Sequence, residues 1–168
     1  MPKETLPVLL GLYYSKGMLV RSAMALVLVT FLLAGCDSSR TTDDVGMRTV
    51  IFPNGTRIKA ESAVRQIELL RGMMFRESLA PDHGMLFTHP AEDIYQYWMF
   101  QTKIPLDIIW LDHDRRIVEI SANTPPCTSK SAKDCPNYGG NFKSRYVLEV
   151  KAGVAQQNGL KAGDQLTF

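Results

Sequence analysis

Short runs of branched and aromatic residues most strongly limit what this chain can fold into. Turn-forming residues separate the runs, and each run has the length of a strand. The runs are Gly84 to Phe87, Ile94 to Met99, Leu106 to Leu111, Arg116 to Ser121, Tyr146 to Val150 and Gln165 to Phe168. This pattern predicts a mainly β (α+β) fold, a compact β-sandwich or barrel-like single domain with one or two short helices.

A hairpin and a helix are expected ahead of these runs. Thr49–Phe52 and Thr56–Glu61 flank Pro53-Asn54-Gly55, in which Asn and Gly both tolerate the positive φ of a tight hairpin turn. Ser62 is expected to cap a helix of about ten residues that ends near Gly72. Its apolar face would hold residues at helical spacing, namely Ala63, Ile67, Leu70 and Met74.

The N-terminal part has the layout of a secretory signal. Arg21 precedes an apolar run from Ser22 to Leu33, and small residues then lead to Cys36. The run is about a dozen residues long, whereas a membrane-spanning helix needs about 20. Leu33-Ala34-Gly35-Cys36 resembles a bacterial lipobox, which implies that Cys36 is acylated and becomes the mature N-terminus. A start at Met18 would give a normal signal.

The lipobox divides the chain into a signal peptide at 1–35, a lipidated tether at 36–48 and a domain at 49–168. The tether is polar and spans at most about 40 Å when fully extended. We therefore expect a lipid-anchored, extracytoplasmic protein of the bacterial cell envelope that works close to the membrane. Asp37 resembles a signal for retention in the inner membrane.

Charge argues against nucleic acid as a partner. Lys3, Lys16 and Arg21 against Glu4 give residues 1–35 a net charge of +2, which equals the formal charge of the whole chain. The remainder is therefore neutral and carries no arginine run, unlike a typical nucleic-acid-binding surface.

The other two cysteines are Cys127 and Cys135. In an oxidising compartment such a pair is most simply a disulfide that closes a short loop. A metal pair is the alternative, but further ligands would be needed nearby. The histidines, His83, His89 and His113, are expected in solvated loops, and we expect no metal, no cofactor and no familiar catalytic motif.

Asp107 stands out because it lies inside the apolar run Ile104 to Leu111. A buried carboxyl group needs a cation or several hydrogen-bond donors, or it stays protonated. Arg71 and Arg76 are the expected cations. One hypothesis is a structural ion pair, and the other is a pocket lined by Arg76, Trp98, Met99, Gln101, Thr102 and Asp107.

Methionine offers a different kind of site. Five methionines follow the predicted cleavage point, and thioethers can hold Cu(I), although they also fill cores. They are Met47, Met73, Met74, Met85 and Met99.

Several motifs in order closely resemble the family called domain of unknown function 192, from about Val50 to Phe168. They are Gly72–Arg76, Gly84–Phe87, Trp98–Asp107 and Tyr146–Glu149, followed by Ala152-Gly153 and Gly163-Asp164. The family often has Asn at the position of Gln101 and Lys at that of Phe100. The segment from Pro125 to Pro136 resembles an insertion of some exported members. The resemblance implies a compact, mostly β domain and no established reaction.

Together these features favour a non-catalytic accessory domain at the membrane surface that binds a small ligand or an envelope protein. The alternatives are an envelope enzyme with a polar pocket around Arg76, Trp98 and Asp107, or copper handling by methionine.

Overall fold

The computed structural model describes residues 46–168, and the predicted signal peptide, Cys36 and most of the tether lie outside this part. The strands are β1 (Met47–Ile51), β2 (Arg57–Ala63), β3 (His83–Ile94), β4 (Tyr97–Trp98), β5 (Leu106–Leu111), β6 (Ile117–Thr124), β7 (Asn137–Tyr138) and β8 (Lys143–Lys151). The helices are α2 (Gln66–Arg71), η2 (Ala132–Asp134) and α3 (Val154–Gln157). None of these helices is long and apolar enough to cross a bilayer.

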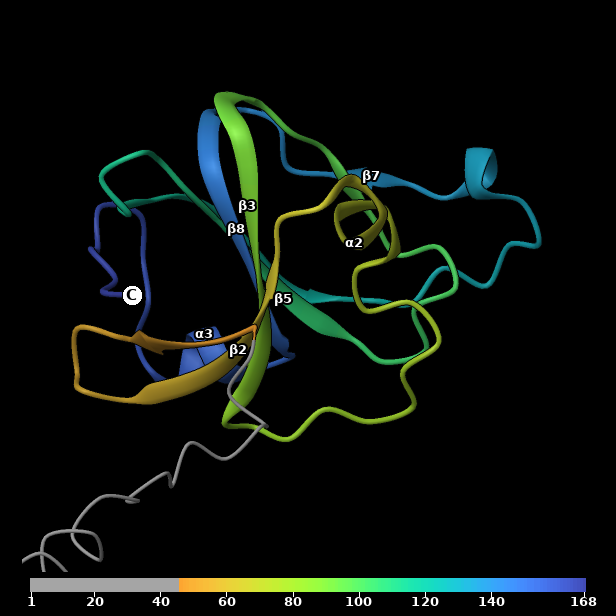
Figure 1. Ribbon diagram of the computed structural model, residues 1–168. Coiled ribbons are helices and arrows are strands. Elements are labelled where there is room, and N and C mark those ends of the chain that lie inside the picture. Colours follow the sequence, from red (N-terminus) through yellow and green to blue (C-terminus); the bar gives the residue numbers. More distant parts are fainter. Residues whose placement is uncertain (1–45) are drawn as a thin grey trace, which may run out of the picture. The chain divides into compact units, whose positions relative to one another are not determined.

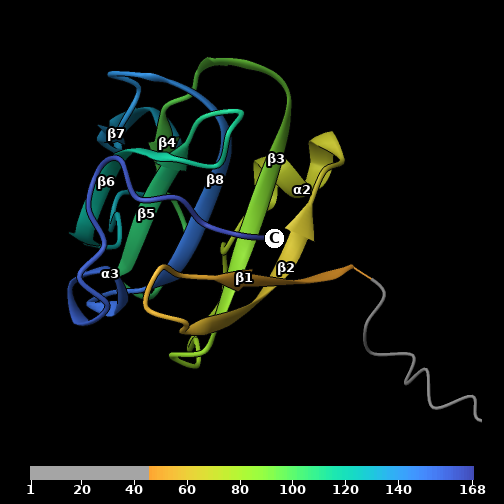
Figure 2. The same cartoon turned by 90° about the vertical axis from the view of Figure 1, so that its left-hand side faces the viewer.

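Six strands form one sheet in the order β1-β2-β3-β8-β5-β6, and β4 pairs with β7 in a separate ribbon (Figures 1 and 2). Strands β2 and β3 run parallel, whereas the other neighbours are antiparallel. The predicted mainly β fold with short helices is confirmed, and the sheet is not closed into a barrel.

The predicted hairpin is also confirmed. Val50 pairs with Ile58 in the β1–β2 register. The turn between the strands contains Gly55 at φ 87°, a conformation that a glycine adopts without strain.

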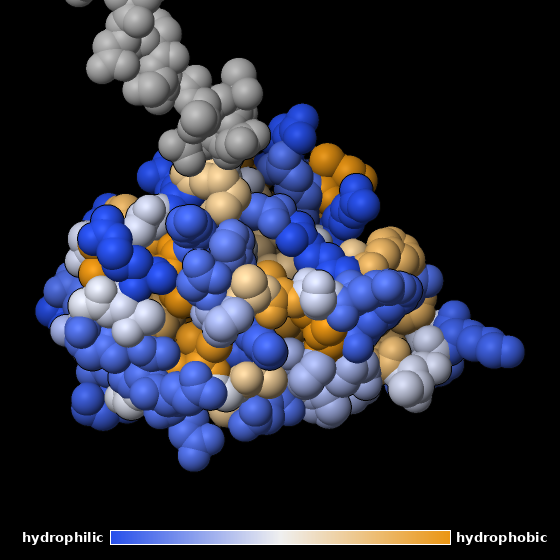
Figure 3. All heavy atoms as spheres, turned by 90° about the horizontal axis from the view of Figure 1, so that it is seen from below, coloured by the Kyte–Doolittle hydropathy of each residue, from blue (hydrophilic) through white to orange (hydrophobic). Residues whose placement is uncertain are grey.

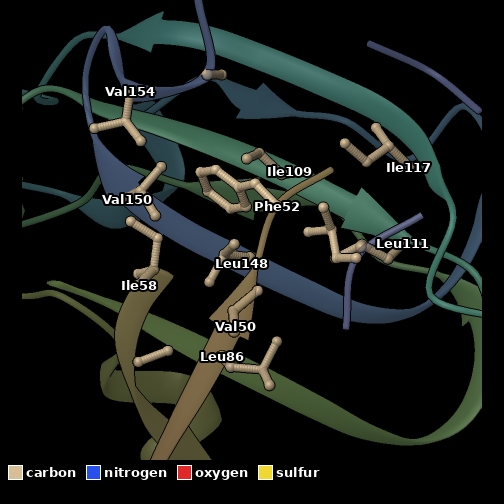
Figure 4. Close-up of a cluster of buried hydrophobic side chains, with 13 residues drawn as sticks. Val50, Phe52, Ile58, Leu86, Ile109, Leu111, Ile117, Leu148, Val150 and Val154 are labelled. Atoms are coloured by element: carbon tan, nitrogen blue, oxygen red, sulfur yellow. The ribbon is translucent and has the colours of Figure 1, made fainter. Parts of the chain in front are cut away.

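Both faces of the sheet are buried, which explains why all six residues of β5 are buried. Alternate residues enter two separate hydrophobic clusters. Leu86, Ile109 and Leu148 belong to the first cluster, which Figure 4 shows. Their neighbours Phe87, Ile108 and Val147 belong to the second.

The first face is covered by β1, which passes in front of the sheet in Figure 2, together with α3 and the C-terminal residues. The strand predicted at Gln165–Phe168 is reduced to two isolated bridges, Ile51 to Thr167 and Arg116 to Gln165. This segment therefore spans between the two edge strands without pairing along either one.

The helix over the second face is shorter than predicted. Ser62 lies in β2, paired with Leu86 of β3, so α2 begins only at Gln66. Glu68 accepts hydrogen bonds from the backbone amides of Val64 and Arg65 and starts the helix there. Two of the four residues expected to face the core are exposed, Ile67 by 66% and Leu70 by 59%, while Ala63 is buried but belongs to β2. The expected apolar helix face is therefore wrong.

The remaining cover of the second face comes from the segment around β4 and from the loop after β6. Cys127 and Cys135 are joined by a disulfide in the structure, with their Cα atoms 5.7 Å apart. The Cys127 amide donates to the Met99 carbonyl at 3.1 Å, which fastens the loop to the segment after β4. Figure 3 shows one face of the molecule, where hydrophobic side chains gather mainly in gaps between hydrophilic ones.

Candidate functional site: a cleft above Glu149

A cleft of about 510 Å³ lies on the second face of the sheet. Helix α2 supplies Leu69 and Leu70 to its lining, and Gly72 and Met73 follow. Aromatic side chains come from β3 and from β4, and Glu149 of β8 also lines the cleft. The cleft is therefore mainly apolar and aromatic, with a carboxyl group among its walls.

Glu149 is the most unusual residue in this cleft. Its neighbours in the sheet are Met85 of β3 and Ile108 of β5, both apolar. The side chain is only 4% exposed, and its Oε2 atom is buried with no hydrogen-bond partner in the described chain. Burial raises the pKa of Glu149 to about 8, although the positive charge of Arg76 acts in the opposite direction. The group is therefore mostly a neutral carboxylic acid at pH 7.

Arg76 is held by a different carboxylate. Its two terminal nitrogens donate to the two carboxylate oxygens of Glu61, each at 2.6 Å. This bidentate pair lowers the pKa of Glu61, and it lies in a neighbouring cleft that shares Arg71, Gly72 and Met74 with the first. Arg76 therefore influences Glu149 through space without pairing with it.

Asp107 is buried as predicted, but not against an arginine. Its Oδ1 accepts a hydrogen bond from the Asn123 amide, and its Oδ2 accepts one from the Ala155 amide, both at 2.8 Å. Ala155 lies in the first turn of α3, on the opposite side of the sheet from the cleft. The expected pairing with Arg71 or Arg76 is wrong, because backbone donors satisfy the carboxyl group.

A histidine–tyrosine pair forms another part of the cleft. His89 Nε2 lies 3.0 Å from the hydroxyl of Tyr97, and the imidazole stacks on the Tyr95 ring at 3.5 Å between centroids. Burial lowers the pKa of His89 to about 4, with a contribution from Arg145, and burial also raises the pKa of Tyr97. Both groups are uncharged at pH 7. The prediction that His89 lies in a solvated loop is wrong, since it belongs to β3 and is 8% exposed.

The six predicted pocket residues do not share one site. Trp98, which is 40% exposed, and Thr102 line the cleft together with Glu149. Arg76 lines the neighbouring cleft, and Asp107 lies on the other face. Of the remaining two, Met99 is fully buried in the second hydrophobic cluster.

Gln101 has a backbone role in this region. It is exposed, adopts φ 53° and accepts a hydrogen bond from the Phe75 amide through its carbonyl oxygen at 2.8 Å. The contact ties the segment after α2 to the segment after β4. Only Trp98 and Thr102 of the predicted set therefore lie in the cleft.

Sequence reasoning missed Glu149, although a signal was present. The residue interrupts the apolar run Tyr146 to Val150, just as Asp107 interrupts Ile104 to Leu111. A charged residue within a buried strand needs a partner or a function, and this rule selects Glu149 as well as Asp107.

The methionines lie partly in the core and partly at the two clefts. Met73, Met85 and Met99 are core residues, while Met47 lies in β1 and Met74 lines the clefts. Residues 46–168 also contain no group of three or more His, Cys, Asp or Glu side chains that could hold a metal ion.

These features define a mainly β domain whose large sheet is covered on both faces. An aromatic cleft on one face contains a buried carboxyl group. The chain belongs to the family DUF192, described as "Uncharacterized ACR", whose match covers residues 49–168. The suspected family is thus confirmed.

Curated relatives carry the family name UPF0127. One, from Thermococcus kodakarensis, is 25% identical over 115 residues, which are 66% of this chain and 64% of the relative. Another, from Thermococcus gammatolerans, is 26% identical over 107 residues, which are 61% of each chain. The chain thus spans less than two thirds of the length of these relatives.

Two solved structures are similar to this fold. A protein of unknown function from Novosphingobium aromaticivorans is 34% identical with a TM-score of 0.63, covering 71% of this chain and 82% of the other. A putative transcription regulator from Sinorhizobium meliloti is 31% identical with a TM-score of 0.62, covering 71% and 89%. The match makes up most of both solved chains.

Proposed function

We infer that this protein is a binding domain for a small ligand, held at the membrane surface of the bacterial cell envelope by acyl chains on Cys36. The observation that carries the binding function is the cleft with Glu149 in its lining. A buried polar atom without a partner costs about 1–3 kcal/mol, and a ligand group that bonds to the carboxyl would recover part of this cost. The volume of about 510 Å³ is in the range of small-molecule sites.

Two features support the proposed location. The described domain starts at Gly46, ten residues after Cys36, so a lipid anchor would keep the cleft near the bilayer. The Cys127–Cys135 disulfide is typical of proteins in oxidising compartments. Labelling with a palmitate analogue tests the anchor: the intact chain should become labelled, and Cys36→Ser should not.

Native mass spectrometry tests the binding function. Residues 46–168 would be secreted to the periplasm, purified without detergent and measured directly. We expect a reproducible adduct that is lost in Trp98→Ala, because Trp98 lines the cleft. The matched control is Phe142→Ala, which removes another exposed aromatic side chain that is not part of the lining.

A small-fragment screen by NMR completes this test. Fragments should shift the resonances of cleft residues in the wild type and less in Trp98→Ala. A protein with neither an adduct nor a fragment-induced shift in the cleft would contradict the proposed binding function.

One observation favours an enzyme as the second candidate. An acid with a pKa of about 8 can act as general acid or base near neutral pH, and Glu149 shares its cleft with the His89–Tyr97 pair. This site differs from the pocket expected around Arg76 and Asp107. If the co-purified compound is converted by the wild type and left unchanged by Glu149→Gln, the domain is an enzyme.

A further inference from the structure

The charges of the residues that line the cleft limit which class of ligand can bind there. Titratable or charged groups line the cleft that contains Glu149 and the neighbouring cleft. Arg71 from α2, His89 from β3, and Tyr95 and Tyr97 from the segment around β4 line the first cleft. Glu61 from β2, Glu68 from α2 and Arg76 line the neighbouring one, and Arg76 acts on Glu149 through its charge. The facing residues of β5 and β7, Ile108 and Asn137, are uncharged.

Most of these groups carry no net charge near Glu149. Glu61 is neutralised by its bidentate contact with Arg76, and His89 is uncharged because burial holds its pKa at about 4. Arg71 adds a positive charge to the lining. With Glu149 protonated, the cleft therefore offers no negative charge to a cation.

A neutral carboxyl group has a distinctive pattern of hydrogen-bonding atoms. It places an O–H donor beside a C=O acceptor, and the complementary ligand group has an acceptor beside a donor. Primary amides and lactams have this arrangement. The cleft walls, which include Phe87, Tyr97 and Trp98, suit a flat ring attached to such a group.

We propose that the cleft selects an uncharged aromatic ligand that presents an amide-like edge to the carboxyl of Glu149, and that it discriminates against cations of the same shape. This proposal rests on the proposed binding function and names its ligand class. A cation would have to displace the proton of Glu149 and to approach Arg71 and Arg76.

Benzamide and benzamidine test the proposal because they share a shape and differ in charge. A fragment of nine heavy atoms is expected to bind with a Kd of about 10 mM, which NMR titration can measure. In residues 46–168 at pH 6.5, benzamide should shift cleft resonances with a lower Kd than benzamidine. Its affinity should fall about tenfold by pH 9 as Glu149 ionises.

Three variants define the role of Glu149. Glu149→Gln keeps a donor beside an acceptor, so benzamide should bind without the fall at high pH. Glu149→Leu fits the apolar layer and removes both hydrogen-bonding atoms, so benzamide binding should be lost. Glu77→Gln changes an exposed carboxylate that pairs with Lys103 outside the cleft, and it should behave as the wild type.

The outcomes separate this proposal from the function on which it rests. Tighter binding of benzamidine, or benzamide binding that does not change with pH, would overturn the ligand class while leaving a binding cleft in place. Failure of both probes to bind in the cleft would overturn the ligand class, and the co-purification experiment then decides the binding function separately.

Discussion

Asp107 and Glu149 lie on neighbouring strands of the sheet but on opposite faces, and the protein treats them differently. Asp107 is fully buried and accepts a backbone hydrogen bond on each oxygen. Glu149 is almost as buried, has an Oε2 atom without a partner and lines a cleft. The same chemical group therefore fixes α3 against the sheet on one face and keeps an unpaired buried oxygen on the other.

The difference shows what distinguishes a structural carboxyl from a candidate site. Burial alone does not distinguish the two carboxyl groups, because both are buried. Completion of hydrogen bonding distinguishes them, since each oxygen of Asp107 has a donor whereas Glu149 Oε2 has none. Each prediction below tests this distinction, from the largest expected effect to the smallest.

The same acid-to-amide change at the two positions should have unequal effects. Asp107→Asn turns one oxygen into an NH₂ group that faces a backbone N–H, and it should lower the free energy of unfolding by about 2–4 kcal/mol. Glu149→Gln resembles the neutral acid but takes up no proton on folding at pH 7, so it should raise the free energy of unfolding, by up to about 3 kcal/mol. Urea unfolding at pH 7 measures both values. Equal losses in the two variants would remove the distinction.

The raised pKa of Glu149 should destabilise the fold as the pH rises from 4.5 to 8. Its pKa is about 8 in the folded state and 4.5 in the unfolded reference, so the folded state holds the extra proton between these values. The associated stability is complete below pH 4.5 and is lost as the pH rises through 8. From pH 6 to 9 the wild type should lose about 2–3 kcal/mol relative to Glu149→Gln. Parallel pH profiles for the two proteins would show that Glu149 is not protonated in the fold.

His89 should limit stability from the acid side. Its folded pKa of about 4 lies below the reference value of 6.5, so the unfolded state takes up the proton first and the contribution of His89 to stability falls from pH 6.5 to 4. Between pH 7 and 5 the wild type should lose about 1–2 kcal/mol relative to His89→Gln, a comparison in which the opposite contribution of Glu149 cancels. Thermal unfolding across this range is the measurement.

His113→Gln is the control for that experiment. His113 is exposed, and its hydrogen bond with Glu92 raises its pKa, so its contribution has the opposite sign. If His113→Gln removed the acid loss and His89→Gln did not, the assignment to the cleft would be wrong.

Local sequence signals predicted the parts of the fold that depend on near neighbours. The Asn54-Gly55 turn forms the β1–β2 hairpin, and the run Leu106 to Leu111 matches β5 residue for residue. The helix was misplaced because β2 continues through Ser62 to Ala63, where parallel pairing with β3 supplies hydrogen bonds that no local pattern reveals. Tertiary pairing overrode the capping signal.

The site was harder to predict for the same reason. Asp107 was recognised as a buried acid, but its partners lie 16 and 48 residues away and are backbone amides, which every residue except proline carries. The sequence contains no mark of such a contact. Glu149 interrupts an apolar run just as Asp107 does, and only the structure shows that it lines a cleft and has an unpaired carboxyl oxygen.

The smallest expected effect concerns the charge that acts on Glu149 from a distance. Arg76 lowers the pKa of Glu149 without bonding to it, and it also neutralises Glu61. Arg76→Gln should therefore raise the Glu149 pKa further, by roughly half to one unit, because it removes a cation and leaves Glu61 as a nearby negative charge. The ¹³C resonance of the Glu149 carboxyl, followed against pH, measures the change.

Arg57→Gln, on an exposed residue at the start of β2, controls for a general loss of positive charge and should leave that titration unchanged. The amides of Asn123 and Ala155 should remain protected from exchange in both variants, because the Asp107 contacts lie on the other face. A fall in the Glu149 pKa would mean that the substitution admits water to the carboxyl, and burial would then depend on the Arg76–Glu61 pair. In that case the cleft would be an opening that this ion pair keeps closed on one side, rather than a site formed by the sheet alone.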